Sequence, residues 1–298
     1  MNAQELSGVI AVNKPQGWTS FDVIGKLRGV LHIRRLGHGG TLDPMATGVL
    51  PVFVGKATRC CDIMPDKRKC YTAGFRLGLT TDTQDITGEI LSQSDKAVAR
   101  GEIEELLPAF TGDIMQLPPM YSAVKVGGKK LVDLARGGKQ IERTPRKIHI
   151  NSLNITEYDE QSREGTLEID CMQGTYVRTI IDDIGSKLGC GGAMTSLIRT
   201  RSGGFTIDEC YTIDELQKLA DEGGIGGVIL PTDRVFEMYP SAALDERCTG
   251  LYKNGVKLRP DQAGFTDGGI HRIYARDGSF LGLAQLINGE LRAVKNFY

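Results

Sequence analysis

A glycine-rich stretch around Asp43 constrains this chain more than any other segment. Residues 37–50 read GHGGTLDPMATGVL and place four glycines around one acidic side chain. Glycine adopts positive φ angles without steric cost, and Pro44 disfavours the α conformation at Asp43. The apolar run over residues 49–54 that follows is typical of a buried strand. The stretch therefore predicts a fixed bend that presents the Asp43 carboxylate before a core strand, and both an Asx-type structural turn and a functional acid fit it.

Strands and helices alternate irregularly along the chain. Apolar runs and two-residue alternation predict strands over residues 9–12, 49–54, 71–77, 148–150 and 167–171. Helical spacing predicts helices over residues 57–64, 102–110, 177–188 and 212–221, and one that Ser20 caps and that ends near residue 31. Because no regular βαβ repeat is present, the expected fold class is α+β with a mainly antiparallel sheet.

The composition changes near residues 223–227, which contain four glycines, and Pro231 follows shortly afterwards. Beyond residue 239 the chain consists of short apolar segments separated by Asn-Gly and Asp-Gly turns, a spacing typical of a small β-rich module. We therefore predict a large domain over residues 1–231 and a small one over residues 232–298.

Cysteine and histidine usage argues against metal sites and disulfide frameworks. The seven cysteines are odd in number and form no CxxC pair, and the four histidines show no metal-ligand spacing. The sequence therefore predicts reduced thiols and no bound metal. The chain contains no apolar run long enough for a membrane span, and its N-terminus does not resemble a signal peptide, so we expect a cytoplasmic protein.

Basic residues are concentrated in one window although the net charge of the chain is −1. The window contains Lys125, Lys129, Lys130, Arg136, Lys139, Arg143, Arg146 and Lys147. Only Asp133 and Glu142 oppose them. A local positive surface of this kind fits contact with RNA, and it also fits an ordinary solvated face.

Several ordered blocks resemble one enzyme family. The stretch GHGGTLDPMATGVLPVFVGKAT closely resembles the catalytic motif of the tRNA pseudouridine synthase B family. The blocks VNKPQGWTSFDVI, KCYTAGFRLGLTTDTQDITG, LPPMYSAVKVGGKK and GTYVRTIIDDIGSKLG are similar to that family's blocks and occur in its order. The resemblance is strong over residues 8–200 and weaker afterwards. It implies the pseudouridine synthase fold, a long mixed sheet with a central catalytic cleft, followed by a short PUA-like RNA-binding module.

The resemblance implies an isomerase that converts uridine-55 in the T loop of tRNA to pseudouridine. Asp43 matches the family's catalytic aspartate. It would attack uracil C6, attack C1′ or assist loss of the C2′ proton, and the residues do not decide among these routes. The isomerisation needs no redox change and no transferred group, so no cofactor is expected. The base would have to be flipped out of the RNA to reach such a pocket.

The resemblance also assigns substrate contacts and supporting positions. The substrate-binding positions are His38, Tyr71, Tyr176, Arg178 and Leu197. Arg178 would keep Asp43 ionised, because a guanidinium stays charged and bonds a carboxylate with two donors. Lys14 and Asp85 match supporting positions. Taken alone, Tyr71 and Leu197 also fit core positions, His38 fits a turn residue and Arg178 fits the surface of a helix.

The basic window falls within the family's insertion, about residues 119–147, which clamps the T arm of tRNA. The resemblance thus implies tRNA as the partner of a monomer that needs no guide RNA. Two positions depart from the family pattern: Gly39 replaces a common Thr, which should loosen the turn, and Leu131 replaces a common Tyr.

Three other functions fit parts of the sequence. An RNA chaperone would act by unfolding and refolding the tRNA elbow, with or without isomerisation. A guide-RNA-dependent enzyme would need further protein and RNA partners. A glycosidase would need a second carboxylate across the scissile bond, for which Asp85 is the candidate.

Overall fold

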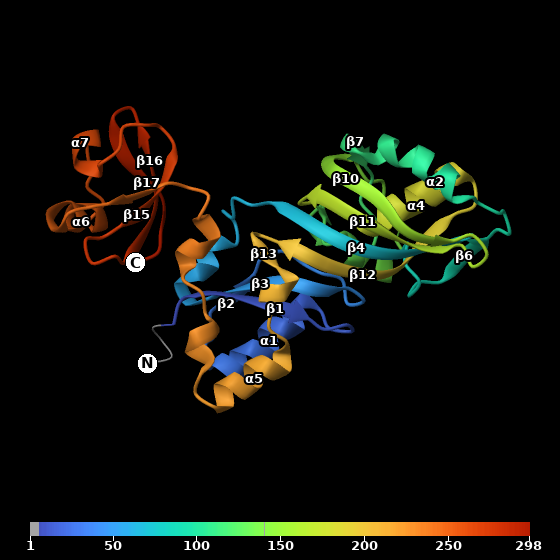
Figure 1. Ribbon diagram of the computed structural model, residues 1–298, viewed down its shortest axis with the longest axis horizontal. Coiled ribbons are helices and arrows are strands. Elements are labelled where there is room, and N and C mark those ends of the chain that lie inside the picture. Colours follow the sequence, from blue (N-terminus) through green and yellow to red (C-terminus); the bar gives the residue numbers. More distant parts are fainter. Residues whose placement is uncertain (1–5, 140) are drawn as a thin grey trace. The chain divides into compact units, whose positions relative to one another are not determined.

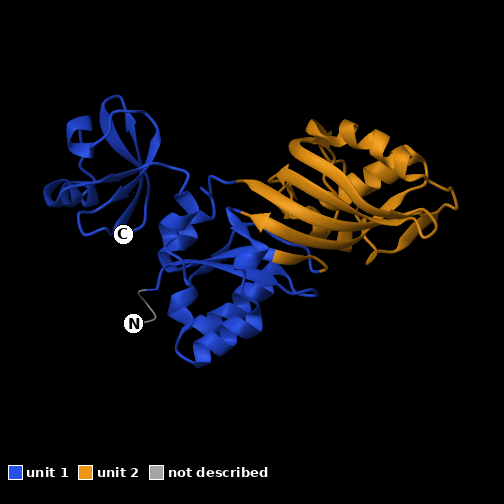
Figure 2. Ribbon diagram, viewed as in Figure 1, with its two compact units in different colours: residues 1–44, 49–66, 203–298 blue, residues 45–48, 67–202 orange. Residues whose placement is uncertain are grey.

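The computed structural model describes residues 6–139 and 141–298. The chain divides into two compact units, and each is described by itself (Figure 2). Unit 1 comprises residues 1–44, 49–66 and 203–298, and unit 2 comprises residues 45–48 and 67–202. Unit 1 is therefore built from both ends of the chain.

The N-terminal part of unit 1 packs strands on two helices. Strand β1 (Gly8–Lys14) neighbours β3 (Thr47–Val54), which pairs on its other side with β2 (Leu36–His38). Helices α1 (Ser20–Leu31) and α5 (Ile213–Asp221) lie side by side against these strands (Figure 1). Their shared core is formed by buried aliphatic side chains of all these elements.

Helix α1 starts one residue earlier than the sequence predicts, because Thr19 and not Ser20 is its cap. Thr19 is the N-cap: its side chain accepts a hydrogen bond from the Asp22 amide, while the Asp22 carboxylate accepts one from the Thr19 amide. This reciprocal capping box needs an acidic residue three positions after the cap, and only Thr19 has one there. Ser20 is the first helical residue, and its hydroxyl is used elsewhere.

The C-terminal part of unit 1 is β-rich. A four-stranded sheet contains, in order, β14 (Ser241–Ala243), β15 (Ile270–Tyr274), β16 (Phe280–Ile287) and β17 (Glu290–Asn296). Helices α6 (Glu246–Lys253) and α7 (Pro260–Ala263) cover it. Phe297 and Leu283 also join a buried cluster with Val9 and Phe53, so this module shares part of its core with β1 and β3.

Unit 2 is a curved sheet with helices packed against it (Figure 1). Its strands follow the order β12 (Gly192–Ser202), β4 (Arg68–Leu77), β11 (Glu164–Met172), β10 (Arg146–Asp159) and β7 (Gly112–Gln116), all antiparallel. The first two residues of β3 pair in parallel with β12, so the sheet is mixed. Helices α4 (Val177–Leu188) and α2 (Arg100–Leu106) contact each other and the sheet.

Shorter elements complete the described chain. Unit 2 has two small hairpins, β5 (Leu79–Thr81) with β6 (Ile90–Gln93) and β8 (Lys125–Val126) with β9 (Lys129–Lys130), the helix α3 (Leu131–Arg136) and the 3-10 helix η2 (Leu107–Phe110). Unit 1 has β13 (Phe205–Thr206) and the 3-10 helices η1 (Gly55–Cys60), η3 (Ile207–Glu209), η4 (Ile225–Val228) and η5 (Thr232–Phe236).

The α+β fold with a large mixed sheet and a C-terminal β module confirms the predicted class. The helix predicted over residues 57–64 is wrong in type. This segment forms η1, and the Cys61 amide donates to the Thr58 carbonyl in the i→i+3 pattern of a 3-10 helix. No helix in the described residues combines the length and apolarity needed to cross a membrane.

Candidate active site

The loop that carries Asp43 is fixed on both sides within unit 1. Before the acid, the Leu42 amide donates to the Ser20 hydroxyl at 2.9 Å. After it, the carbonyl of Pro44 accepts a hydrogen bond from the Gly17 amide at 2.8 Å. Leu42 is buried, whereas Asp43 is half-buried and Pro44 is exposed. The backbone is thus held at residues 42 and 44 while the carboxylate between them keeps access to solvent.

Lys14 supports the same loop from the end of β1. Its side chain is fully buried. The ammonium donates to the carbonyls of Trp18 at 2.6 Å, Pro15 at 2.9 Å and Pro44 at 3.4 Å. A buried ammonium is costly unless its donors are satisfied, and these three carbonyls supply acceptors. Lys14 therefore joins the residue after Asp43 to the turn before α1.

His38 ends β2, opposite Val52 of β3, and is half-buried. The next residue, Gly39, donates its amide to the Pro51 carbonyl at 2.8 Å. A Cβ added at Gly39 would lie 3.0 Å from the Met64 sulfur, so a larger residue here would require Met64 to move. The turn that follows His38 is thus packed against Met64, at the position where the sequence departs from the family pattern.

Tyr71 and Leu197 lie on the same face of the unit 2 sheet. Tyr71 of β4 is opposite Arg199 of β12, and Leu197 is opposite Ala73, two residues along β4. Side chains two residues apart on a strand share a face, so Tyr71 and Leu197 are diagonal neighbours. Both are 7% exposed. This burial fits a dry pocket wall, and it equally fits the core positions that these residue types suggest alone.

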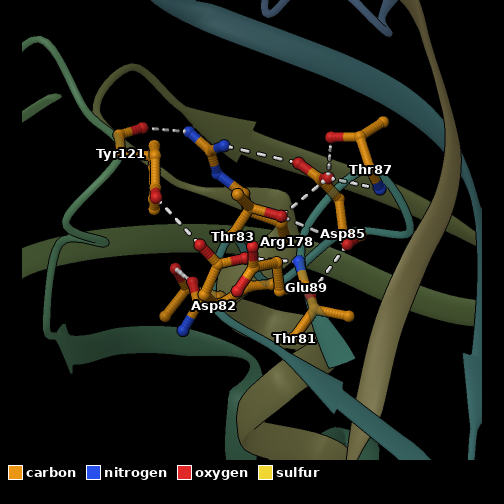
Figure 3. A network of polar contacts seen from close by, with 10 residues as sticks. Thr81, Asp82, Thr83, Asp85, Thr87, Glu89, Tyr121 and Arg178 are labelled. Atoms are coloured by element: carbon orange, nitrogen blue, oxygen red, sulfur yellow. Dashed lines mark hydrogen bonds and ion pairs between the residues drawn. The ribbon is translucent and has the colours of Figure 1, made fainter. Parts of the chain in front are cut away.

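Arg178 and Asp85 form a buried ion pair in unit 2 (Figure 3). The Arg178 Nη1 and Asp85 Oδ2 atoms are 3.6 Å apart, and the side chains are 6% and 5% exposed. The other oxygen, Oδ1, accepts hydrogen bonds from the Thr83 and Thr87 hydroxyls and from the Thr87 amide. Arg178 is therefore not the surface helix residue that its type alone suggests.

Two hydrogen bonds with Gln116 hold the backbone of Tyr176, and the sequence did not predict them. Tyr176 is the N-cap residue of α4, and its amide donates to Gln116 Oε1 at 2.9 Å. Gln116 Nε2 donates back to the Tyr176 carbonyl at 3.0 Å. Gln116 is 2% exposed at the end of β7. A single glutamine thus fixes the backbone two residues before Arg178, and no local sequence pattern identifies it.

The predicted residues therefore form two groups. Lys14, His38 and Asp43 belong to unit 1. Tyr71, Asp85, Tyr176, Arg178 and Leu197 belong to unit 2. Within the described residues, no cluster of three or more His, Cys, Asp or Glu side chains is arranged to hold a metal ion.

Comparisons with known proteins agree with these motifs. A profile of the TruB family pseudouridylate synthase N-terminal domain matches residues 28–177, and one of the tRNA pseudouridylate synthase B C-terminal domain matches residues 178–237. The tRNA pseudouridine synthase B of Stutzerimonas stutzeri (strain A1501) is 37% identical over 95% of this chain and 92% of its own. This chain belongs to the tRNA pseudouridine synthase B family.

Further members and structures support the assignment. The tRNA pseudouridine synthase B of Bacillus pumilus (strain SAFR-032) is 39% identical over 92% of this chain and 91% of its own. A chain in the crystal structure of a Cbf5-Nop10-Gar1 complex matches with a TM-score of 0.75 and 26% identity, over 100% of this chain and 86% of that chain. A chain of an H/ACA RNP bound to a substrate RNA containing 2′-deoxyuridine matches with a TM-score of 0.73 at 23% identity, over 98% of this chain and 85% of that chain, and shows the same fold.

The basic window of this family member is distributed over the β8–β9 hairpin, α3, the loop that follows α3 and the start of β10. Lys125, Lys129, Arg136 and Lys139 are exposed on or beside the small hairpin and α3. Arg146 and Lys147 are instead exposed at the start of β10, and the Lys147 ammonium pairs with Asp113 at 2.9 Å. Arg143 is half-buried and donates to the Pro118 carbonyl at 2.9 Å. Lys130 lies in β9, and its side chain is outside the described part of the chain.

Two further residues near the predicted positions were missed. Tyr121, within the quoted block LPPMYSAVKVGGKK, accepts a hydrogen bond from Arg178 on its main-chain carbonyl at 2.6 Å. Lys69 precedes Tyr71 by two residues on β4 and shares its face. Burial, and then the positive charge of Arg199, lower the pKa of Lys69 to about 8. The block containing Tyr121 was recognisable in the sequence, but the role of this residue depends on contacts 57 residues away in the chain.

Proposed function

We propose that this enzyme isomerises uridine-55 in the T loop of tRNA to pseudouridine. The observation that carries the proposal is the match to relatives named tRNA pseudouridine synthase B, which covers more than nine tenths of both chains at 37–39% identity. The exposed basic side chains of the insertion add a surface suited to phosphates.

The reaction exchanges one bond for another. The N1–C1′ glycosidic bond breaks, the uracil turns, and a new bond joins C5 to C1′. C5 loses its proton and N1 gains one, so no electrons or groups are gained or lost overall. The protein therefore has to supply a carboxylate, a pocket that retains the free uracil and a means to flip the base, and we propose that no cofactor takes part.

Asp43 is the proposed catalytic residue. Hydrogen bonds fix the backbone on both sides of Asp43. The loop would therefore hold the carboxylate in position before the substrate binds, and no loop ordering would be needed during the reaction. Attack on C6, attack on C1′ and assistance in C2′ deprotonation all remain compatible with this arrangement. Each route needs an ionised carboxylate, and we propose that Arg178 provides the stabilising positive charge.

The other predicted residues would hold the flipped uridine. Tyr71 would stack on the uracil, a contact worth about 1–3 kcal/mol, with its hydroxyl available to the C5 proton. Leu197 would supply an apolar wall, and Tyr176 would contact the ribose and base. His38 would occupy the space that the flipped base vacates. Lys14 and Asp85 would act through Pro44 and Arg178, without touching the substrate.

We propose that tRNA binds this enzyme as a monomer in the cytoplasm and without a guide RNA. The insertion over residues 119–147 would clamp the T arm, and residues 232–298 would form a PUA-like RNA-binding module after the catalytic domain, residues 1–231. Activity on a bare transcript distinguishes this arrangement from a guide-dependent particle, in which the protein alone would leave the transcript unmodified.

Asp43→Asn tests the catalytic assignment. Purified protein is incubated with an unmodified tRNA transcript, and isomerised uridines are mapped. We expect complete conversion at one T-loop position by the wild type, none by the variant, and equal tRNA affinity for both. Asp62→Asn, which changes an exposed acid in the same unit, is the matched control and should retain full turnover. Normal conversion by the Asp43 variant would refute the proposal.

The same variant separates the alternative functions. If the protein also acts as an RNA chaperone, Asp43→Asn will still accelerate refolding of tRNA while it makes no pseudouridine. A glycosidase would release free uracil, which the conversion assay detects as an abasic site. Asp85 is a poor second carboxylate for such an enzyme, because its side chain is buried and already bonded by two threonines and paired with Arg178.

A further inference from the structure

The basic insertion is joined to Arg178 through one residue. Tyr121 lies at the start of the insertion and is half-buried. Its main-chain carbonyl accepts a hydrogen bond from Arg178 Nη2 at 2.6 Å, while its hydroxyl donates to Asp82 Oδ2 at 2.8 Å (Figure 3). Tyr121 thus bonds the arginine with its backbone and the turn that carries Asp85 with its side chain.

The turn over residues 82–89 is a closed, cross-linked unit. Asp82 Oδ1 accepts the Glu89 amide at 2.8 Å, and the Asp82 amide donates to the Glu89 carbonyl at 3.1 Å. The Thr81 hydroxyl donates to the Asp85 carbonyl at 2.7 Å. Asp82 and Asp85 are therefore part of one hydrogen-bonded turn.

Backbone hydrogen bonds link the residues that follow Tyr121 to the start of α3. The Val132 amide donates to the Ser122 carbonyl at 3.1 Å, and the Leu131 amide donates to the Val124 carbonyl at 2.8 Å. Leu131, at the start of α3, is fully buried. These two bonds join residues 122 and 124 to the start of α3, which lies beside the exposed lysines.

A cavity separates the insertion from the turn where these contacts end. Its volume is about 420 Å³, and Asp82, Tyr121, Lys139 and Arg143 are among its lining residues. The Tyr121–Asp82 hydrogen bond joins two of these lining residues. The cavity also leaves room for the insertion to shift when phosphates bind its basic residues.

We infer that Tyr121 is a positioning residue through which the basic insertion sets the guanidinium of Arg178 against Asp85. The inference rests on the proposed function, because it assigns the purpose of this link to RNA binding. When tRNA binds the insertion, Tyr121 is displaced. This displacement moves the Tyr121 carbonyl, to which Arg178 Nη2 donates, and also moves Asp82, to which the Tyr121 hydroxyl donates. Binding of tRNA at the surface of the insertion and positioning of the Arg178 guanidinium against Asp85 are then coupled.

Tyr121→Phe tests the link by removing one oxygen while keeping the ring and the main-chain carbonyl. We expect the single-turnover rate constant at saturating tRNA to fall about tenfold, because a hydrogen bond to a charged group is lost. The Kd for tRNA should change by less than about twofold, since no proposed phosphate contact is altered. A fall in rate with unchanged affinity distinguishes positioning from a general loss of folded protein.

Tyr158→Phe is the matched control. Tyr158 is also half-buried in unit 2, and its hydroxyl also donates one hydrogen bond, to the Val98 carbonyl at 3.1 Å. We expect both variants to show similar thermal unfolding, and only Tyr121→Phe to lose rate. Equal rates for the wild type and Tyr121→Phe, or equal losses for the two variants, would overturn the inference.

Hydrogen exchange of the RNA-free protein gives a readout that does not depend on activity. In Tyr121→Phe we expect severalfold faster exchange at the Thr87 and Glu89 amides, which donate to Asp85 and Asp82, and unchanged exchange in Tyr158→Phe. Identical exchange in all three proteins would overturn the link. A wild type that leaves uridine unmodified would refute the proposed function, and the exchange comparison would still decide whether Tyr121 controls the turn.

Discussion

Gly48 shows how one residue type is imposed by a close approach of two backbones. Its φ angle is +101°, and a Cβ at this position would lie 2.2 Å from the Arg199 carbonyl oxygen. Gly48 pairs with Arg199 in the parallel segment of the unit 2 sheet, five residues after Asp43. The sequence predicts that the glycines of the loop permit a bend. The structure shows in addition that a side chain at residue 48 would clash with the backbone of Arg199.

Gly48→Ala is expected to destabilise the protein by several kcal/mol, because strained φ and a clash with backbone add to each other. Gly174→Ala is the matched control: its φ is +95°, but a Cβ there would meet no atom within 4 Å. Gly174→Ala should lower the free energy of unfolding by only about 1 kcal/mol, through backbone strain. Urea unfolding of both variants measures the difference, and equal losses would show that the clash is relieved by movement of β12.

Lys69 gives stability a pH dependence whose sign follows from its depressed pKa. In the folded protein the pKa of Lys69 is about 8, below the ordinary lysine value of 10.5, so between these values the unfolded chain binds more protons. Stability contributed at this site therefore rises as pH increases from about 8 to 10.5. Below pH 8 the buried positive charge opposes folding.

Lys69→Met should remove this dependence, since methionine fills the space without a charge. We expect the free energy of unfolding of the wild type to increase relative to the variant as the pH is raised from 7.5 to 10. Denaturant unfolding at several pH values measures the difference, in which the titration of all other groups cancels. Parallel curves for the two proteins would contradict the depressed pKa.

At the scale of elements, the position of α4 depends on its contact with the end of β7. Gln116 satisfies both the amide and the carbonyl of Tyr176, the N-cap residue, and no side-chain cap is present at this helix start. The helix C-terminus was predicted from the local sequence: Gly189 ends it with a φ of +73°, as a left-handed cap should. The N-terminus was fixed by a residue 60 positions earlier.

Gln116→Ala should lower the free energy of unfolding by about 2–4 kcal/mol, because it leaves the partly buried amide and carbonyl of Tyr176 without this partner. It should also slow tRNA turnover, since Arg178 lies in the first turn of the same helix. Thermal unfolding and single-turnover assays check the two effects. Gln93→Ala, an exposed glutamine of β6, serves as the control and should change neither quantity. An unaltered melting temperature for the Gln116 variant would show that water replaces the amide.

At the scale of the whole molecule, the charge is almost balanced, at −1, so attraction to RNA has to come from local surfaces. The exposed cations of the insertion that have no acidic partner among the described residues provide such a surface. Arg143, which bonds Pro118, and Lys147, which pairs with Asp113, are less free to neutralise phosphate.

Replacing Lys125, Lys129, Arg136 and Lys139 with alanine should weaken tRNA binding and reduce its salt dependence. Each lost phosphate contact lowers the slope of log K against log[salt] by about 0.7–0.9. A combined variant should therefore lose roughly 3 units of slope. Titrations between 50 and 200 mM salt check this, and an unchanged slope would place the phosphates on another surface.

The sequence by itself determined the local features of this protein. It predicted the bend that holds Asp43, the α+β class, the last residue of α4 and the β-rich C-terminal segment, because turns, caps and periodicity are set by neighbouring residues. The tertiary structure alone decided how Lys14 is buried against Pro44, and that Asp85 and Tyr121 hold Arg178. These partners are 30 to 93 residues apart in the chain, and a local pattern contains no information about which distant strands and turns will meet.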